Sequence, residues 1–414
     1  MSELLTVEEH LRSILGAVRQ LEAETIPVPG ARGRTLSSPL RAAVDIPVFD
    51  NSAMDGFAVR FVDVADAAAD APAPLRVVAD LPAGTDLDPP LGPGEAARIM
   101  TGSPVPAAAD AVVPFEDTVG GLEDSLGVIS VVRAPRAAGA HIRRRGEDAR
   151  EGDVLLPAGT LVGPLQAAAA AAAGVSHLAV ARTPRVAIVS TGSELAAAGS
   201  PLLRGQIPES NSELLAGLAE EAGAGVVLRR SVPDESDALR AVLAHADDVG
   251  ADVIVFSGGV SAGAYEVVKG TLGPGGEMGF VKVAMQPGKP QGFGHVPGGA
   301  LLFGLPGNPV SAAVSFEVFV RPALLAMQGR TDIHRPVIRL GAAVSWRTPP
   351  GRRQYLPAVI DRTDPARWTV RPATGGGSGS HLAGGLGRAE AYAIVPAGVD
   401  AVAAGDLVDV MLVS

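Results

Sequence analysis

Apolar residues near the start of the chain recur at the spacing of one helix face. They are Leu11, Ile14, Leu15, Val18 and Leu21. They follow Thr6-Val-Glu-Glu9, which has the threonine and glutamate spacing of a capping box. The pattern therefore predicts an amphipathic helix at the start of the chain.

From Asp45 to about Gly139 the pattern changes to short alternating segments that proline and glycine interrupt. Examples are Leu75–Ala79, Ala97–Met100 and Val128–Arg133. Alternation of this kind predicts a small β-rich module. The stretch Asp153–Gly174 then predicts a turn and an alanine-rich helix that ends at Gly174.

After Pro184, apolar runs typical of buried strands alternate with helical patterns. The predicted strands are Val186–Ser190, Val226–Leu228, Val253–Phe256 and Leu301–Phe303. The predicted helices are one that Ser210-Asn-Ser-Glu213 caps and that ends at Gly223, one at Asp237–Ala246, and one that begins at Asn308-Pro309. Such alternation predicts a parallel, doubly wound sheet.

The tail from about Thr331 has short apolar segments and glycine-rich turns, with Gly375–Ser380 as a loop. It predicts a β-barrel or a sandwich. Because 414 residues exceed one ordinary core, we expect a multidomain protein of α/β and β domains.

The chain contains no cysteine, which excludes disulfides, thiolate zinc sites, iron–sulfur clusters and cysteine nucleophiles. Its seven histidines form no pair with metal-ligand spacing. A metal site would therefore consist of carboxylates and would suit a hard cation such as Mg²⁺.

The net charge of −11 argues against a nucleic-acid partner, because a phosphate backbone needs a basic face. Residues Met1–Arg12 carry early glutamates and lack the apolar core of a signal peptide. The alanine run Ala167–Ala173 is too short to cross a membrane. We therefore expect a cytoplasmic protein with no membrane partner.

Three loops of small residues follow predicted strands, where doubly wound sheets bind their ligands. They are Thr191-Gly-Ser-Glu194, Ser257-Gly-Gly-Val-Ser261 and Gly304-Leu-Pro-Gly-Asn-Pro309. For any one loop, turn geometry explains the glycines as well as a binding role does. Three such loops at one sheet edge favour a site where backbone N–H groups bind an oxyanion.

Charged residues lie beside these loops: Glu194, Asp234, Glu266, Lys282 and Lys289. Each alone is more typical of a solvated surface. Together they suit a polyanion bridged by a metal ion, with carboxylates for the cation and lysines for the anion. No Walker A sequence occurs.

Two further segments are candidates for binding. Asp45–Arg60 places three aspartates and an asparagine in a turn-rich stretch, as a binding loop would. Arg143–Asp148 combines three arginines with two acids, and an exposed, self-neutralising turn explains it equally well.

These segments, in this order, resemble the molybdopterin molybdenumtransferase family, which includes the E-domain of gephyrin. The matching stretches are Asp50–Ala58, Ile99–Pro106, Arg143–Asp148, Ser190–Leu195, Ser257–Ser261, Pro287–Pro290 and Gly304–Ser311. The stretch Asn51–Gly56 is highly specific to this family, whereas the Ser-Gly-Gly and Pro-Gly-Asn-Pro loops are shared with molybdopterin adenylyltransferases.

The resemblance implies four domains. They are a linker domain at 1–44 and 140–180, a β-rich insert at 45–139, an α/β molybdopterin-binding domain at 181–328, and a C-terminal β-barrel at 329–414. It also implies the reaction: molybdate joins the dithiolene of adenylylated molybdopterin, and AMP is released. The implied enzyme depends on Mg²⁺ and is a homodimer, with molybdopterin adenylyltransferase and molybdenum enzymes as transient partners.

The resemblance also assigns site residues. The implied catalytic residues are Asp55, Thr101, Asp148, Glu194, Asp234 and Glu266, of which Glu194, Asp234 and Glu266 would also handle the metal. The implied substrate contacts are Ser257, Gly258, Gly259, Ser261, Lys282, Lys289, Pro306, Pro309, Ser311, Arg352 and Ser380.

The chain departs from the family pattern at three positions. Glu266 stands where aspartate is usual, Gln286 where many members have lysine, and Pro357 where arginine is frequent. Two other functions stay open: an adenylyltransferase that charges molybdopterin with AMP, and a non-catalytic scaffold like gephyrin in its receptor-binding role. The additional domains argue against the first, and the retained carboxylates argue against the second.

Overall fold

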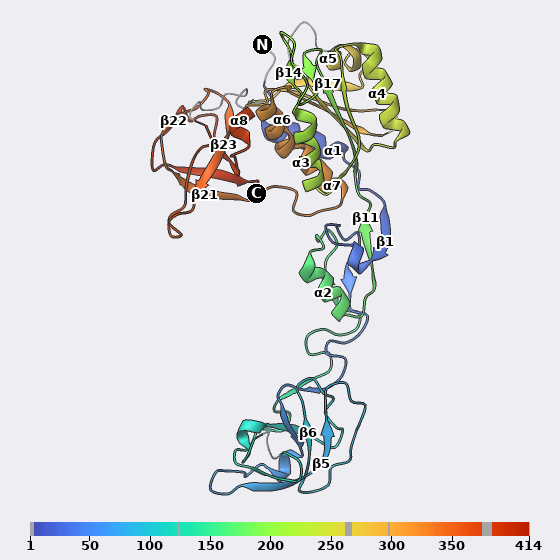
Figure 1. Cartoon of the computed structure of the whole chain (residues 1–414), viewed down its shortest axis with the longest axis vertical. Helices are drawn as coiled ribbons and strands as arrows, with labels where there is room; N and C mark the ends of the chain where they lie inside the picture. The colour runs from blue at the N-terminus through green and yellow to red at the C-terminus, as the bar shows by residue number, and fades with distance from the viewer. Residues whose placement is uncertain (1–3, 122–124, 261–266, 297–298, 375–382, 414) are drawn as a thin grey trace.

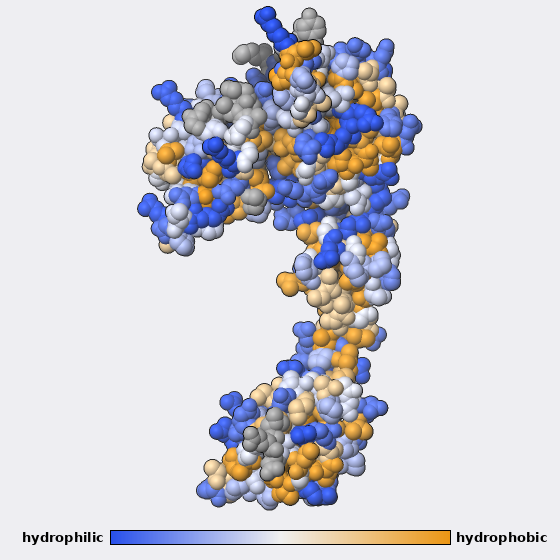
Figure 2. Space-filling view, viewed as in Figure 1, coloured by the Kyte–Doolittle hydropathy of each residue, from blue (hydrophilic) through white to orange (hydrophobic). Residues whose placement is uncertain are grey.

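The computed structural model describes residues 4–121, 125–260, 267–296, 299–374 and 383–413. The molecule is elongated, both as a ribbon (Figure 1) and in the space-filling view (Figure 2). The β-rich insert occupies one end, and the α/β sheet and the C-terminal barrel lie together at the other. A narrow connecting region that contains α2 joins the two ends.

The first helix, α1 (Val7–Ala17), has the predicted capping box. Thr6 Oγ1 accepts from the Glu9 backbone N–H at 3.1 Å, and the Thr6 N–H donates to Glu9 Oε2 at 2.8 Å. The helix ends earlier than its apolar pattern suggested, because the backbone turns extended at Val18. Val18 and Leu21 still pack against the core of the α/β domain.

The connecting region is built from two separate stretches of chain. Strand β1 (Ala23–Pro27) pairs with β11 (His177–Ala181), and β2 (Leu40–Arg41) pairs with β10 (Val154–Leu156), both antiparallel. The alanine-rich helix α2 (Pro164–Ala172) covers them, and Gly174 follows it at φ +73°. These pairings hold the outgoing and the returning chain side by side.

The insert contains a five-stranded sheet in the order β7-β4-β6-β5-β8. Its strands are β4 (Gly56–Val59), β5 (Ala73–Leu81), β6 (Glu95–Ile99), β7 (Ala111–Pro114) and β8 (Val128–Val131). Both faces are covered, because one small apolar core contains Phe57 and Phe115 and another contains Leu81 and Ile99. The alternating segments that the sequence predicts overlap β5, β6 and β8.

The α/β domain has a six-stranded sheet in the order β15-β12-β16-β20-β19-β17. Four strands are parallel: β12 (Arg185–Thr191), β15 (Gly225–Val232), β16 (Val253–Ser257) and β20 (Leu301–Leu305). At the edge, β19 (Pro290–His295) pairs antiparallel with β20, and β17 (Met278–Lys282) pairs antiparallel with β19. The four predicted strands are therefore parallel as expected, and the sheet continues at this edge with two further strands that the apolar pattern does not predict. Only residues 283–289 join β17 to β19, too few for a crossover helix.

The helices of this domain are α3 (Asn211–Glu221), α4 (Ser236–Asp248), α5 (Val267–Leu272), α6 (Pro309–Ser315) and α7 (Arg321–Met327). The sequence predicts that Ser210-Asn-Ser-Glu213 caps α3, but the Ser210 side chain makes no capping hydrogen bond. Instead the Glu209 carboxylate accepts from the Ser212 backbone N–H at 2.9 Å.

A π-helical turn at Phe316–Val320 joins α6 to α7. The combined stretch Pro309–Met327 is long and apolar enough to cross a membrane, but 89% of its most apolar window is buried inside the protein. Glu317 in the turn is buried, and both of its oxygens accept from Arg335 at 2.9 Å. This ion pair fixes the chain that leads into the C-terminal domain.

The C-terminal domain is a closed barrel. Its strands are β21 (Val337–Ala342), β23 (Arg353–Asp361), β24 (Thr369–Pro372), β25 (Ala391–Val395) and β27 (Leu407–Leu412). The barrel closes because β23 pairs with both β24 and β25. In addition, β18 (Met285–Gln286) of the α/β domain pairs in parallel with the start of β23. This pairing brings one end of the barrel to the sheet edge where the small-residue loops lie.

Candidate active site

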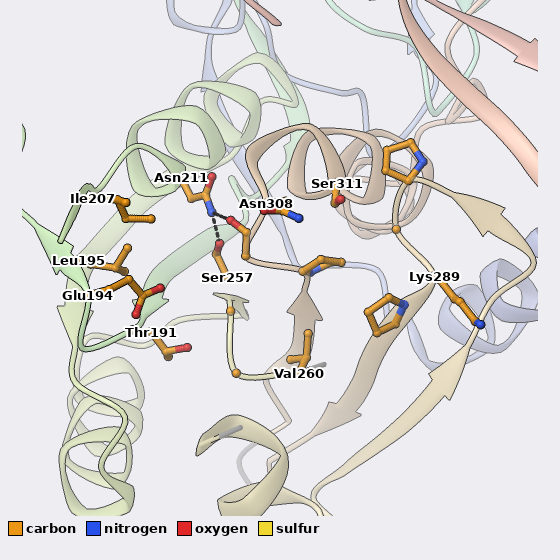
Figure 3. A pocket seen from close by; sticks show the side chains of 18 of the residues that line it. Thr191, Glu194, Leu195, Ile207, Asn211, Ser257, Val260, Lys289, Asn308 and Ser311 are labelled. Atoms are coloured by element: carbon orange, nitrogen blue, oxygen red, sulfur yellow. Dashed lines mark hydrogen bonds between the residues drawn. The ribbon is translucent and has the colours of Figure 1, made fainter. Parts of the chain in front are cut away.

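The carboxyl ends of β12, β16 and β20 open into a cavity of about 890 Å³ (Figure 3). The three loops of small residues line it, together with the Met285–Pro290 segment and Arg352 from the start of the barrel. Of the sequence-predicted residues, the lining includes Glu194, Asp234, Ser257, Gly258, Gly259, Lys289, Pro306, Ser311 and Arg352. The parallel strands place these residues together, because their carboxyl ends lie at the same edge.

Glycine is required in the loop after β16 by conformation and by space. Gly258 has φ +96° and Gly259 has φ +65°, values that favour glycine. A Cβ on Gly258 would lie 2.5 Å from the Thr191 carbonyl oxygen, and a Cβ on Gly259 would lie 2.9 Å from Val268 Cγ2. The loop after β16 therefore packs directly against the loop after β12, and both form one wall of the cavity.

Two carboxylates lie at one end of the cavity. Asp234 Oδ2 accepts from the Ser193 backbone N–H at 3.1 Å, and the Asp234 N–H lies 3.3 Å from Ser193 Oγ. Glu194 is exposed, and its carboxyl group folds back over Gly192. This end of the cavity therefore offers carboxylate oxygens to a cation.

Lys289 and Arg352 line another part of the cavity, with Gln286 and Ser311 nearby in its wall. In Figure 3, Lys289 and Glu194 lie on opposite sides. Arg352 reaches the cavity because the next residue, Arg353, donates its backbone N–H to the Ala284 carbonyl at 2.9 Å. The cavity is therefore charged in opposite senses at its two sides.

Lys282 and Pro309 do not line this cavity. Lys282 is exposed at the end of β17, and Pro309 is the first residue of α6. Gly307 and Asn308 line the cavity in place of Pro309. Ser261, Glu266 and Ser380 lie outside the described residues.

Sequence reasoning missed Asn211. It is buried at the first position of α3, where its Nδ2 donates to Ser257 Oγ and to the Gly307 carbonyl, each at 2.6 Å (Figure 3). The Ser210-Asn-Ser-Glu213 pattern by itself indicates only the start of a helix. The available signal was topological: a helix that follows β12 begins near the same sheet edge as the loops.

Glu209 fixes the beginning of α3. Its Oε1 accepts from Ser190 Oγ and from the Ser212 backbone N–H, both at 2.9 Å. Burial raises the pKa of Glu209, but the hydrogen bonds from Ser212 and Ser190 outweigh that effect and leave the pKa below its ordinary value. Glu209 is therefore a structural carboxylate that ties α3 to β12.

The remaining predicted residues lie at the other end of the molecule. Asp55 Oδ1 accepts from the Thr101 backbone N–H at 2.6 Å and from Thr101 Oγ1 at 2.7 Å. These two hydrogen bonds hold the pKa of Asp55 below its ordinary value. Asp148 is exposed beside the insert. Within one chain, the insert is remote from the cavity of the α/β domain (Figure 1).

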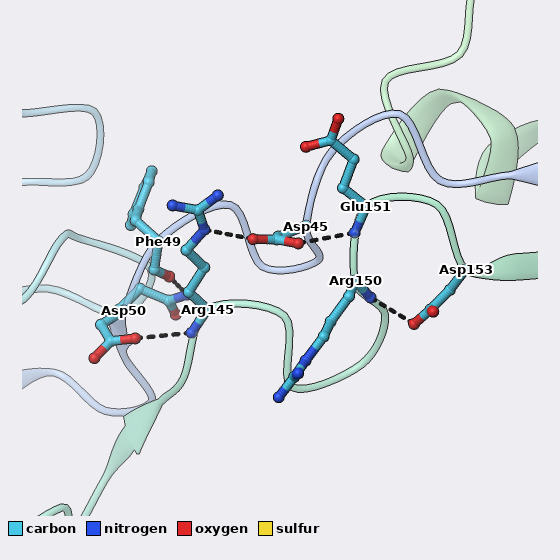
Figure 4. A network of polar contacts seen from close by, with 8 residues as sticks. Asp45, Phe49, Asp50, Arg145, Arg150, Glu151 and Asp153 are labelled. Carbon is cyan, nitrogen blue, oxygen red and sulfur yellow. Dashed lines mark hydrogen bonds and ion pairs between the residues drawn. The ribbon is translucent and has the colours of Figure 1, made fainter.

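The Arg143–Asp148 segment connects to the Asp45–Arg60 segment (Figure 4). Asp45 accepts from Arg145 Nε at 2.5 Å and from the Glu151 N–H at 2.8 Å. Asp50 accepts from the Arg145 N–H at 2.8 Å and from Arg144 Nη1 at 2.6 Å. Arg144 and Arg145 of the returning chain therefore pair with aspartates of the outgoing chain. These contacts hold the two segments together where they pass between the linker domain and the insert.

Models of known protein families match nearly the whole chain. Residues 5–174 match a family model described as "MoeA N-terminal region (domain I and II)". Residues 187–326 match "Probable molybdopterin binding domain", and residues 339–413 match "MoeA C-terminal region (domain IV)". Molybdopterin molybdenumtransferase 2 of Mycobacterium tuberculosis is 46% identical over 86% of this chain and 88% of its own length. The chain belongs to the molybdopterin molybdenumtransferase family.

Two further members of this family extend the comparison. The molybdopterin molybdenumtransferase of Nostoc is 34% identical over 93% of this chain and 88% of its own length. The crystal structure of the molybdopterin biosynthesis moeA protein from Pyrococcus horikoshii is 27% identical, covers 99% of this chain and 100% of its own, and has a TM-score of 0.84. The family resemblance and the fold class predicted from the sequence are confirmed.

Proposed function

We propose that this chain is an enzyme that inserts molybdate into adenylylated molybdopterin, releasing AMP and completing the molybdenum cofactor. The observation that carries the proposal is the polarity of the cavity. Glu194 lies on one side and Lys289 on the opposite side, with glycine-rich loops between them. Asp234 is hydrogen-bonded to Ser193, next to Glu194, and Arg352 precedes Arg353, whose N–H bonds to Ala284 in the segment that leads to Lys289. Such a cavity suits a substrate with a cation-bridged pyrophosphate together with an oxyanion co-substrate.

The positive and the negative residues of the cavity suit different ligands. Lysine and a guanidinium group are suited to molybdate, which is a dianion, and backbone N–H groups of the loops add further donors. On the other side, the Glu194 and Asp234 carboxylates would repel the phosphates of the substrate. A bound cation removes that repulsion, so we propose Mg²⁺ as the cofactor.

The donor set fits Mg²⁺. This cation keeps several waters and binds through one or two carboxylates plus substrate phosphates. Glu194 and Asp234 supply two carboxylates, and Asp234 Oδ2 is already fixed by Ser193. Among the described residues, no group of three acidic or histidine side chains is close enough to form a cage. When bound, Mg²⁺ would neutralise charge that develops as the pyrophosphate is cleaved.

We also propose a cytoplasmic homodimer in which each cleft is shared between subunits. Asp55, Thr101 and Asp148 carry the family's motifs, yet the insert lies far from the cavity of its own chain. A second copy of the chain would supply them to that cavity. Molybdopterin adenylyltransferase, as the source of the substrate, and molybdenum enzymes, as acceptors of the product, are the proposed transient partners.

One assay separates this function from the two alternatives. Purified protein is given adenylylated molybdopterin, Mg²⁺ and molybdate, and AMP and the finished cofactor are measured. We expect both products only when molybdate is present. Adenylylation of molybdopterin from ATP without molybdate would instead indicate an adenylyltransferase, and no AMP release under any condition would indicate a non-catalytic scaffold.

A further inference from the structure

The buried amide of Asn211 has an orientation that the structure determines. The Gly307 carbonyl oxygen can only accept a hydrogen bond, so the group that faces it at 2.6 Å must be the amide nitrogen. The same nitrogen lies 2.6 Å from Ser257 Oγ and has a second proton to donate. Asn211 therefore donates to both neighbours.

This orientation decides the role of the Ser257 hydroxyl group. Because Ser257 Oγ accepts from Asn211, its own proton is free to be donated elsewhere. Within the described part of the chain, Asn211 is the only hydrogen-bond partner of that hydroxyl. Ser257 lines the cavity and is itself almost completely buried. The cavity is therefore where an acceptor for its proton would lie.

Asn211 is placed rigidly enough to impose this arrangement. Glu209 ties the beginning of α3 to Ser190 at the end of β12. The amide then bridges the loops after β16 and β20. Those loops touch, since a Cβ on Gly307 would lie 3.5 Å from the Gly258 Cα. Glu209 and Asn211 together thus connect the ends of three neighbouring strands.

We propose that Asn211 is a positioning residue, which orients the Ser257 hydroxyl to donate a hydrogen bond to a tetrahedral oxyanion in the cavity. The oxyanion is a phosphate of the nucleotide part of the substrate or molybdate itself. The inference rests on the proposed function for the identity of these ligands. Asn211 itself need not touch them.

The test uses Asn211→Asp and Ser257→Ala, alone and together. A carboxylate in place of the amide accepts from Ser257, so the hydroxyl proton turns away from the cavity, whereas Ser257→Ala removes that proton. Binding of two probes, AMP and sodium molybdate, is measured by calorimetry on the full-length protein. Each single variant should weaken one probe by about tenfold to a hundredfold, as expected for a hydrogen bond to a charged group.

The double variant distinguishes positioning from a general structural role. If Asn211 acts through Ser257, the affinity of the double variant for the probe is no lower than that of the single variant with the lower affinity. Additive losses, unchanged binding in Ser257→Ala, or no binding of either probe to the wild-type protein would overturn the inference. Where Asn211→Asp does not fold, as judged by thermal unfolding, Asn211→Ser, which is too short to bridge both loops, replaces it.

The chain offers a matched control. Ser315 Oγ accepts from Gln291 Nε2 at 2.8 Å, and the same amide donates to the Gly288 carbonyl at 2.6 Å. Ser315 is fully buried but does not line the cavity. Ser315→Ala should therefore leave both probe affinities unchanged. Turnover is measured separately: wild-type protein that binds the probes but forms no cofactor would contradict the proposed function and not the role of Asn211.

Discussion

A mixed dimer tests whether the insert of one chain serves the cavity of another. One subunit carries Asp55→Asn and the other carries Glu194→Gln. Asparagine keeps an oxygen that can accept from the Thr101 N–H and Oγ1, so the insert should fold with only a charge removed. Glu194 is exposed, and its amide variant should fold equally well. Both homodimers should lose activity.

The expected magnitude follows from counting clefts. If removal of either charge lowers turnover roughly a hundredfold, each homodimer retains about one hundredth of wild-type activity. In the mixed dimer with shared clefts, one cleft contains both lesions and the other contains none. Its specific activity should therefore be about half that of wild type. If each cleft takes both residues from one chain, both clefts are damaged and activity stays near one hundredth.

The assay measures AMP release by heterodimers purified through two different tags. Asp70→Ala, which removes another exposed carboxylate of the insert, is the matched control and should retain full activity in either arrangement. A mixed dimer as inactive as its parents would refute the shared cleft. Protein that migrates as a monomer at assay concentration would refute the dimer itself.

Three further predictions concern single substitutions. Asp234→Asn should leave folding intact, since an amide oxygen can still accept from the backbone, but should raise the Mg²⁺ concentration needed for half-maximal AMP release; an unchanged Mg²⁺ requirement would remove Asp234 from the metal site. Gln286→Lys should lower the molybdate concentration needed for half-maximal turnover, modestly because solvent screens the added charge, and an unchanged or higher requirement would contradict this. Glu317→Gln should reduce the free energy of unfolding by about 3 kcal/mol, because it leaves Arg335 without its buried charged partner. Denaturant unfolding measures this, and a loss below about 1 kcal/mol would show that water or Glu221 compensates.

The sequence predicted most of the fold where local signals agree with packing. The capping box at Thr6, the strand cores around Val186–Ser190 and Val253–Phe256, and the helix that begins at Pro309 all appear in the structure. The antiparallel strands β17 and β19 were missed for a physical reason. Residues such as Gly279, Gly292 and Gly294 interrupt their apolar pattern, and at Gly294 a Cβ would lie 2.0 Å from the Glu277 carbonyl oxygen. Close backbone contact between strands requires glycine there, and glycine gives no strand signal.

The site shows the same division between local and tertiary information. Loop glycines and charged residues are visible in a sequence because their chemistry is unusual for a core. Asn211 resembles an ordinary first residue of a helix, and only the positions of Ser257 and Gly307, 46 and 96 residues away, give its amide a function. Arg352, which the family resemblance assigns, lines the cavity because β18 pairs with β23. Residues that act on a site through other residues are therefore the ones that sequence patterns identify least well, and substitutions that preserve shape while reversing a hydrogen bond are the way to find them.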